Sequence, residues 1–208
     1  QILNVTMSAG DCVRAEPGAM VHMSPWIKVE QKLAGQGFAR MFTGQQINIS
    51  EFQYTGPVGT ADEITFTPDF PGQIIPIQLE NYGNKIICQK GSLLCSASTV
   101  QMSVEFTRSL GAGFFGGEGF ILQGLIGHGM AFLNARGVII KRDLRPGQRL
   151  TVASGCLVAF QNGVQYSVKT FGGLGNALFG GEGLFVTELT GPGTVWIESH
   201  DMSRLYLT

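Results

Sequence analysis

The chain has 208 residues, of which 44% are hydrophobic and 14% are charged, and its net charge is −1. This composition excludes a disordered chain, and the scattered basic residues form no stripe of the kind that binds nucleic acid, so we expect no nucleic-acid partner. The 30 glycines follow no G-X-Y period, which excludes collagen and predicts turns between many short strands. So little charge predicts that a partner covers part of the apolar surface.

The first half of the chain is predicted to form short strands separated by turns. Glu16-Pro17-Gly18-Ala19 places Pro-Gly at the two central positions of a type II turn. Residues 28–41 are expected to hold at most one short helix, and no other stretch has a convincing 3.6-residue period. The apolar run 73–77 predicts a strand, and the proline inside it predicts an edge strand or a bulge.

The second half continues this pattern. Residues 100–106 and 164–168 alternate apolar and polar side chains, which predicts strands with one buried face. Between them, the run 137–140 predicts another strand, and Arg145-Pro146-Gly147-Gln148 predicts a second type II turn. No apolar run approaches the ~18 residues that a membrane-spanning helix needs. The elements together predict an all-β fold.

An internal repeat organises these elements. Several blocks recur at one constant offset, the one that carries Gly91 onto Gly155 (the 91-to-155 offset). They begin at 91–95, 100–104 and 115–119, and continue at Leu125, Gly127, Gly129 and Phe132. A weaker copy lies upstream at a slightly longer offset, the one that carries Gly18 onto Gly91 (the 18-to-91 offset). We therefore predict a single domain, 1–208, with three tandem repeats at about 1–71, 72–136 and 137–208.

The repeats are predicted to fold together rather than separately. Each is too short to build a good core alone, and no linker-like segment separates one from the next. We expect small antiparallel β units in a pseudo-threefold arrangement that share one core.

Several motifs give the chain a resemblance to a known family. They are Phe-Gly-Gly-Glu-Gly at 115–119 and 179–183, Leu-Thr-Gly-Pro-Gly-Thr-Val-Trp at 189–196, Ser203-Arg204-Leu205, and the run 68–77. With these motifs the chain resembles the altered-inheritance-of-mitochondria family, formerly a domain of unknown function, which occurs in bacteria and in fungal mitochondria. The first repeat departs from the pattern, with Thr43-Gly44-Gln45-Gln46 where Gly-Gly-Glu-Gly would stand.

The resemblance implies a fold and a setting. The implied fold is a β-sandwich similar to that of the tryptophan RNA-binding attenuation protein (TRAP-like). The implied role is in mitochondrial or membrane organisation, with a cytoplasmic location in a bacterium or a mitochondrial one in a eukaryote. The resemblance carries over no catalytic residues, and a likeness of fold alone does not imply RNA binding.

The Gly-Gly-Glu-Gly motifs are interpreted as structural turns. A G-x-G-x-x-G match at 111–116 lacks the helix that a dinucleotide site needs after it. The two glutamates occupy equivalent places, and each can accept backbone N–H groups within its own turn. The predicted turn residues are Gly117, Glu118, Gly119, Gly181, Glu182 and Gly183.

No catalytic residue, metal site or cofactor is predicted. His22, His128 and His200 are isolated in the sequence, and no His/Cys spacing typical of a metal site occurs. The four cysteines form no CxxC pair, and we interpret them as buried free thiols of a reducing compartment, so the protein is not expected to be secreted.

The connections that lead into these turns are the candidate contact surface. Each is glycine-rich and apolar and begins at a basic residue, whereas loops are usually polar. The candidate residues are Phe38, Arg40, Met41, Arg108, Phe114, Phe115, Lys169, Phe171, Leu174 and Leu178. Such a surface suits an anionic membrane or a hydrophobic protein partner, and we expect at least one of Phe38, Phe114 and Leu178 to be exposed in the monomer. Two alternatives are that the connections fold into the core or are buried in a homo-oligomer.

The leading functional prediction is a non-enzymatic β scaffold that assembles with itself or docks to a membrane-associated partner. One alternative is a small-ligand-binding protein with a pocket between the repeats. The other is an enzyme, which would require Glu118, His128 and a thiol to converge in one site.

Overall fold

The computed structural model describes residues 1–34, 47–108, 120–170 and 185–201. Over these residues the protein consists of four antiparallel sheets and two short 3-10 turns, η1 (Leu79–Tyr82) and η3 (Ser154–Cys156). The predicted all-β fold is confirmed. None of the described residues belongs to a helix that is long and apolar enough to cross a membrane.

Six described strands fall in each of the three intervals defined from the sequence. The interval 1–71 contains β1 (Leu3–Ser8), β2 (Cys12–Ala15), β3 (Met20–Met23), β4 (Ile27–Ala34), β5 (Ile47–Tyr54) and β6 (Ala61–Phe66). The interval 72–136 contains β7 (Gly72–Gln78), β8 (Lys85–Gln89), β9 (Leu93–Ala97), β10 (Gln101–Arg108), β11 (Phe120–Ile126) and β12 (Met130–Arg136). The interval 137–208 contains β13 (Ile139–Leu144), β14 (Arg149–Ala153), β15 (Leu157–Gln161), β16 (Gln165–Thr170), β17 (Phe185–Thr190) and β18 (Gly193–Glu198).

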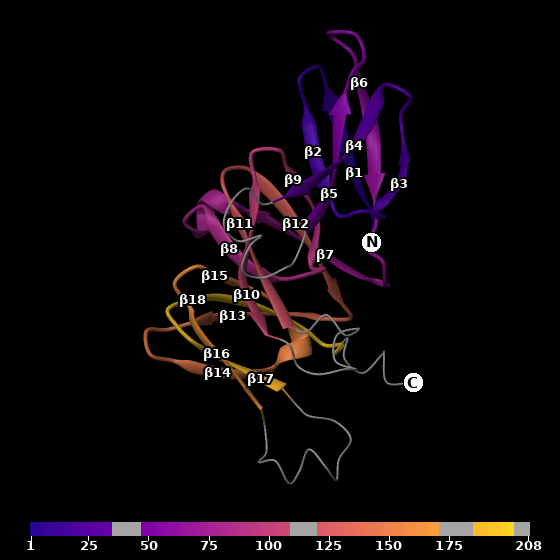
Figure 1. The fold of residues 1–208 in the computed structure, drawn as a ribbon. Helices are drawn as coiled ribbons and strands as arrows, with labels where there is room; N and C mark the ends of the chain where they lie inside the picture. Colours follow the sequence, from indigo (N-terminus) through magenta and orange to yellow (C-terminus); the bar gives the residue numbers. More distant parts are fainter. Residues whose placement is uncertain (35–46, 109–119, 171–184, 202–208) are drawn as a thin grey trace.

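The strands form two large sheets and two small ones (Figure 1). The six-stranded sheets have the orders β4-β5-β2-β9-β12-β7 and β10-β11-β8-β15-β18-β13. The three-stranded sheets have the orders β1-β6-β3 and β14-β17-β16. In Figure 1 the small sheet of β1, β6 and β3 lies at the top, beside β2 and β4 of one large sheet, and that of β14, β17 and β16 lies at the bottom.

The same strand pairings occur in each interval. The first and third strands each pair with the sixth, and the second and fourth strands each pair with the fifth. Two more pairings join neighbouring intervals, β2 with β9 and β8 with β15. All of these pairings are antiparallel, so each large sheet contains strands from two intervals.

The strand β12 illustrates how the sequence produces these elements. Its side chains alternate, with Ala131, Leu133 and Ala135 buried and the residues between them half-buried. A period of two places one set of side chains on one face of a sheet. Complete burial of a leucine contributes about 1.5–3 kcal/mol, so one face of this strand holds it in register between β7 and β9.

The core consists of three clusters of buried side chains. The cluster of the first interval includes two residues of β9, Leu94 and Cys95, and the middle cluster includes two residues of β15, Val158 and Ala159. Aromatic pairs contribute to the packing; in the middle cluster the rings of Tyr82 and Trp196 meet edge to face with centroids 5.1 Å apart. The two junctions between intervals are therefore joined by packing as well as by strand pairing.

Both predicted type II turns are confirmed. At Glu16–Ala19 and Arg145–Gln148, the amide of the fourth residue donates to the carbonyl of the first, at 3.2 and 2.9 Å. The central glycines, Gly18 and Gly147, have φ values of 92° and 74°, which the third position of a type II turn requires.

Two further predictions concern individual segments. The run 73–77 lies in β7, and β7 is an edge strand, as the proline inside the run predicts. The sequence allows at most one short helix within 28–41, and the described part of that segment holds none, because β4 continues through Ala34. Its lysines and glutamates favour helix intrinsically, but full-length pairing with β5 outweighs that preference. Residues 35–41 lie outside the described part of the chain.

Candidate functional site

Three hairpins carry the connections that the sequence identifies as a contact surface: β4–β5, β10–β11 and β16–β17. Of the predicted contact residues, Arg108 is the last residue of β10 and Lys169 lies in β16. The others, Phe38, Arg40, Met41, Phe114, Phe115, Phe171, Leu174 and Leu178, lie outside the described residues, as do the turn residues Gly117, Glu118, Gly119, Gly181, Glu182 and Gly183. The exposure of Phe38, Phe114 and Leu178 therefore stays a prediction.

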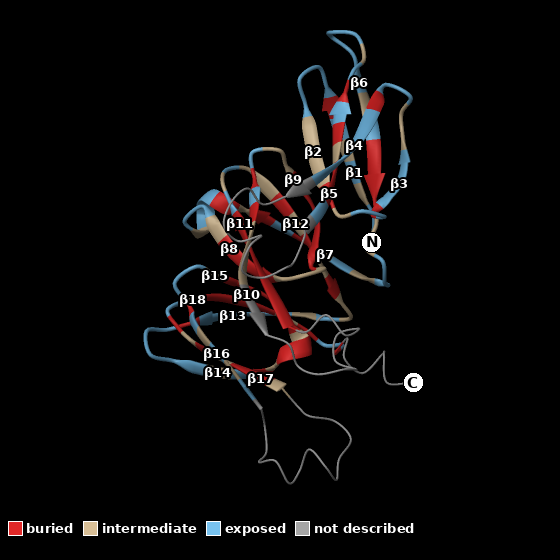
Figure 2. Cartoon of the chain, viewed as in Figure 1, coloured by how far each residue is buried: buried red, intermediate tan, exposed pale blue. Residues whose placement is uncertain are grey.

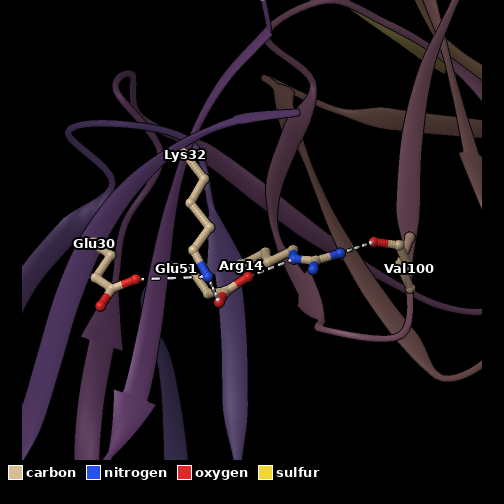
Figure 3. Close-up of polar contacts among 5 residues, drawn as sticks. All are labelled: Arg14, Glu30, Lys32, Glu51 and Val100. Atoms are coloured by element: carbon tan, nitrogen blue, oxygen red, sulfur yellow. Dashed lines mark hydrogen bonds and ion pairs between the residues drawn. The ribbon is translucent and has the colours of Figure 1, made fainter. Parts of the chain in front are cut away.

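An ion-pair network lies on the β4–β5 hairpin (Figure 3). The Glu51 carboxylate accepts hydrogen bonds from the Lys32 ammonium and from Arg14 Nε, the latter at 3.0 Å. Lys32 Nζ also lies 3.6 Å from the Glu30 carboxylate. Arg14 Nη1 donates to the carbonyl of Val100 at 3.0 Å, so this guanidinium connects the first interval to the second.

The electrostatics of this network stabilise the charged forms of Glu51 and Lys32. Hydrogen bonding from Lys32, and then from Arg14, holds the pKa of Glu51 below its ordinary value. The same carboxylate raises the pKa of Lys32. The pKa of the Cys12 thiol is raised mainly by burial and further by the nearby Glu51 charge. Glu51 and Lys32 therefore remain ionised at neutral pH, while the neighbouring Cys12 thiol stays protonated.

The β16–β17 hairpin carries the same arrangement. Lys169 donates to the carboxylate of Glu188, and Arg149 Nη1 lies 3.6 Å from the other oxygen of that carboxylate. The two repeat offsets applied in succession carry Lys32 onto Lys169 and Glu51 onto Glu188, so the two pairs occupy equivalent positions. The Lys169 ammonium lowers the pKa of Glu188, as Lys32 lowers that of Glu51.

The middle hairpin, β10–β11, also carries a glutamate that pairs with a lysine, but the glutamate is at a different position and the lysine comes from β8. The equivalent of Glu188 in the second interval, at the 91-to-155 offset, is Gly124, which has no carboxylate. The acid comes instead from Glu105, where the register of β10 against β11 shifts in a β-bulge. Its carboxylate accepts from Lys85 Nζ at 3.1 Å and from Ser103 Oγ at 2.7 Å. A Cβ at position 124 would lie 2.4 Å from the Glu105 carboxylate, so the glycine leaves the space that the acid needs.

These contacts compensate the charge of two basic residues beside the predicted contact surface. Lys32 and Lys169 are exposed, but each ammonium is hydrogen-bonded to a glutamate of the neighbouring strand. At Lys32 and Lys169 a partner therefore meets a Lys–Glu pair rather than an uncompensated cation. The sequence analysis missed the pairs, although the common offset of both members was a signal that could have found them.

A second group of charged residues lies where the three intervals meet. Burial, and then the charge of Asp69, raises the pKa of Glu16 to about 7. The Arg136 guanidinium lies 4.9 Å from the centre of the Phe70 ring, and its Nη1 lies 3.4 Å from the Glu198 carboxylate. Burial, chiefly, raises the pKa of Glu198 as well. These carboxylates are stabilised less than ordinary surface acids, and Glu16 titrates near neutrality.

The cysteines show no sign of activation. No disulfide joins any two of the four, all of which lie in the described part of the chain. Cys88 and Cys95 are buried, and burial raises the pKa of Cys95 to about 12 and that of Cys88 further still. The predicted burial is confirmed for these two, whereas Cys12 and Cys156 are half-buried. A protonated thiol is a poor nucleophile, so neither buried cysteine is suited to covalent catalysis.

The histidines occupy three separate places. His22 Nε2 lies 3.0 Å from the Thr65 hydroxyl in β6, and His200 Nδ1 lies 3.0 Å from Ser199 Oγ. The backbone carbonyl of His128 accepts from Thr99. Within the described ranges, no three His, Cys, Asp or Glu side chains come together as a metal site would require.

The fold and these contacts define a class: an all-β protein of antiparallel sheets in which the β4–β5 and β16–β17 hairpins each carry a lysine–glutamate pair between their strands. Comparison with known proteins places it more closely. The chain belongs to the family described as mitochondrial biogenesis AIM24, whose sequence model matches residues 1–200. The predicted family resemblance is confirmed.

Two streptococcal proteins are similar to the chain over nearly its whole length. An uncharacterized protein of Streptococcus pyogenes serotype M6 is 23% identical over 214 residues, which cover 98% of this chain and 83% of that protein. The crystal structure of protein SPYM3_0169 from Streptococcus pyogenes matches with a TM-score of 0.79 at 22% identity, covering 98% of this chain and 90% of the other. The latter likeness supports the fold.

Proposed function

We propose that this chain is a non-enzymatic β scaffold, built from three copies of one six-stranded unit, that acts by assembling with further copies of itself. The copies are the intervals 1–71, 72–136 and 137–208. The proposal rests on one observation: neighbouring intervals are joined edge to edge by the same strand pair in the same register.

The register makes this observation specific. At the first junction Ala15 pairs with Cys95, and at the second Cys88 pairs with Ala159. The 18-to-91 offset carries Ala15 onto Cys88, and the 91-to-155 offset carries Cys95 onto Ala159. The two junctions therefore use equivalent positions. Because two successive junctions use equivalent strands in the same register, a further unit can be added in the same way.

A shared irregularity supports the equivalence of the three units. The third strand of each pairs with the sixth through one register shift, between Met20 and His22 in β3, between Leu93 and Cys95 in β9, and between Leu157 and Ala159 in β15. These shifts are again related by the 18-to-91 and 91-to-155 offsets. The paired strands β2–β9 and β8–β15 favour an open succession of units over a closed pseudo-threefold ring, which would also need β14 to pair with β3.

Membership of the mitochondrial biogenesis family favours a role in organising a membrane system, and the connections of the three hairpins are the surface proposed to meet it. The Lys–Glu pairs at Lys32 and Lys169 favour a protein partner over a bare anionic surface, because their charge is already compensated.

The test is the solution mass of the wild-type protein by light scattering over a wide range of concentration. We expect the mass to rise with concentration above the 22.3 kDa of a single chain. Flotation with phosphatidylcholine–phosphatidylglycerol vesicles runs beside it. A constant single-chain mass, without flotation, would overturn the scaffold proposal; flotation of a single-chain species would replace self-assembly with membrane docking.

A further inference from the structure

We propose that the next copy of the chain binds through β3 and β14, with β14 of one molecule pairing antiparallel with β3 of another. This inference rests on the proposed self-assembly and names the surface that carries it. It follows from comparing the edges of the four sheets.

The edge strands of the four sheets are of two kinds. The first and fourth strands of every unit are edges in all three intervals, namely β1, β7 and β13, and β4, β10 and β16. The remaining edges are β3 and β14. Their counterparts at corresponding positions, β9 and β15 for β3 and β2 and β8 for β14, are all interior strands. In the described part of the chain, β3 pairs with β6 alone and β14 with β17 alone. They are therefore the two halves of a junction that the described strands make twice, at β2–β9 and β8–β15, and leave unmade at β3 and β14.

The burial of equivalent side chains agrees with a missing partner. Met20 and Val21 in β3 are 38% and 52% exposed. Their counterparts in β9, Leu93 and Leu94, are 0% and 1% exposed, and the corresponding residues of β15 are completely buried. The same apolar positions are thus covered in two units and uncovered in one, and Figure 2 shows β3 coloured almost entirely as exposed.

The packing indicates what covers these positions. Leu94 reaches from β9 into the core cluster of the first unit, and Val158 reaches from β15 into that of the second. Among the described residues, the cluster of the third unit, around Val152 and Leu189, receives no such side chain from the third strand of another unit. Val21 is the counterpart of Leu94 at the 18-to-91 offset, and it is the side chain that would fill the same place for the third unit of another molecule.

Several other edges carry features that discourage pairing, whereas β3 lacks them, as does β1, whose apolar residues alternate with Asn4, Thr6 and Ser8. The edge strand β7 contains Pro76, and β13 exposes Lys141 and Arg142. The sequence of β3, Met-Val-His-Met, contains no proline, lysine, arginine or acid. Edges of soluble proteins are normally protected by such residues, so a bare apolar edge indicates a strand that is meant to be paired.

The register of the new junction follows from the two existing ones. Cys88 pairs with Ala159 and Ile87 with Phe160. The same relation places Val152 of one chain opposite His22 of the next, and Thr151 opposite Met23. Because β3 and β14 lie at opposite ends of the molecule in Figure 1, the junction is head to tail, and successive chains form an open filament or, if the rotation closes, a ring.

The first arm of the test measures solution mass for Val21→Asp and for Val138→Asp. Val138 is 62% exposed and precedes β13, so it is a matched valine outside the junction. We expect Val21→Asp to raise the concentration for half-assembly at least about tenfold, equivalent to about 1.4 kcal/mol, because an unpaired carboxylate would enter an apolar cluster. Val138→Asp should assemble like the wild type, and circular dichroism checks that both fold.

The second arm tests the register and does not depend on Val21. Thr151→Cys and Met23→Cys are made in separate chains, mixed and oxidised, with wild type as the background for the native thiols. Residues directly opposite in an antiparallel pair bring their Cβ atoms about 4.5–5.5 Å apart, close enough for a disulfide. We expect a reducible dimer from the mixture and not from either variant alone.

The outcomes distinguish a failure of the β3–β14 junction from a failure of the proposed self-assembly. A wild type that stays a single chain overturns both. A wild type that assembles, while Val21→Asp assembles equally well and the mixed cysteines give no dimer, overturns the β3–β14 junction alone. A cross-link that forms only when both cysteines are in one chain, and that leaves it monomeric, replaces the intermolecular junction with closure inside the molecule.

Discussion

The charge of Glu16 is expected to make the protein less stable at alkaline pH, and Glu16→Gln should remove that effect. Burial and the charge of Asp69 raise the pKa of Glu16 from 4.5 to about 7. Well below pH 4.5 the carboxyl is protonated in both folded and unfolded chains. Between 4.5 and 7 the folded chain binds more protons, so the free energy of unfolding falls as the pH rises, and above 7 the loss is complete.

The size of the effect follows from the shift. A pKa unit corresponds to about 1.4 kcal/mol, so the rise to about 7 sets an upper value of roughly 3 kcal/mol. Glu16 is half-buried, and solvent screening reduces this to about 2 kcal/mol. Glutamine keeps an acceptor for the backbone N–H of Gly91 and removes the charge.

The assay is urea unfolding of wild type and Glu16→Gln at pH 4.5 and pH 8. We expect the difference between the two proteins to grow by about 2 kcal/mol in favour of the variant from the lower pH to the higher. Acids that do not interact with Glu16 titrate equally in both proteins and cancel. Glu63→Gln, which removes an exposed carboxyl of β6, is the control and should change stability by less than about 0.5 kcal/mol at either pH. A Glu16→Gln difference that does not change with pH would refute the reasoning.

Three further predictions concern packing and reactivity. Leu133→Ala, at a completely buried position of β12, should lower the free energy of unfolding by about 3 kcal/mol in urea titrations; a cost below about 1 kcal/mol would contradict its place in the core. Gly124→Ala should cost about 1–3 kcal/mol, because its Cβ would lie 2.4 Å from the Glu105 carboxylate, and Glu105→Ala in the same chain should recover most of that cost in a double-mutant cycle. Cys88 and Cys95 should react with a thiol reagent only after denaturation, since burial raises the pKa of both; rapid reaction of either in the native protein at pH 8 would disagree with the structure.

Much of the fold follows from local signals in the sequence. The alternation at 100–106 and 164–168 corresponds to β10 and β16, and the two Pro-Gly pairs form the turns that they predict. These features depend on residues within a few positions of one another. The strand at the start of 28–41 could not be predicted, because its lysines and glutamates favour helix and the contact that decides its structure is the pairing with β5, which is not local in sequence.

The junctions and the ion pairs could not be predicted in the same way. The pairing of β2 with β9 joins strands of different intervals, and nothing local in Val13 or Ala97 marks it. The Lys–Glu pairs require the register of two strands, which a repeat offset suggests but does not supply. The bulge at Glu105 is still harder to predict from the sequence, because it depends on the space beside Gly124. The proposed contact residues in the hairpin connections lie outside the described residues, so the sequence remains their only basis.

The middle hairpin has a consequence for how the repeats of this chain should be compared. When the three intervals are aligned by the repeat offsets, Lys32 and Lys169 fall on an acid, Glu105. Glu51 and Glu188 fall on a glycine, so the alignment alone would suggest that the middle interval has lost the ion pair. In space the carboxylate lies on the opposite strand of the hairpin and pairs with Lys85, and a neutral pair is still present. The three units share the place of the carboxylate rather than the residues that form the pair. Substitution patterns in related chains should therefore be judged by the summed charge of the hairpin face, since single columns will overstate how much these proteins have changed.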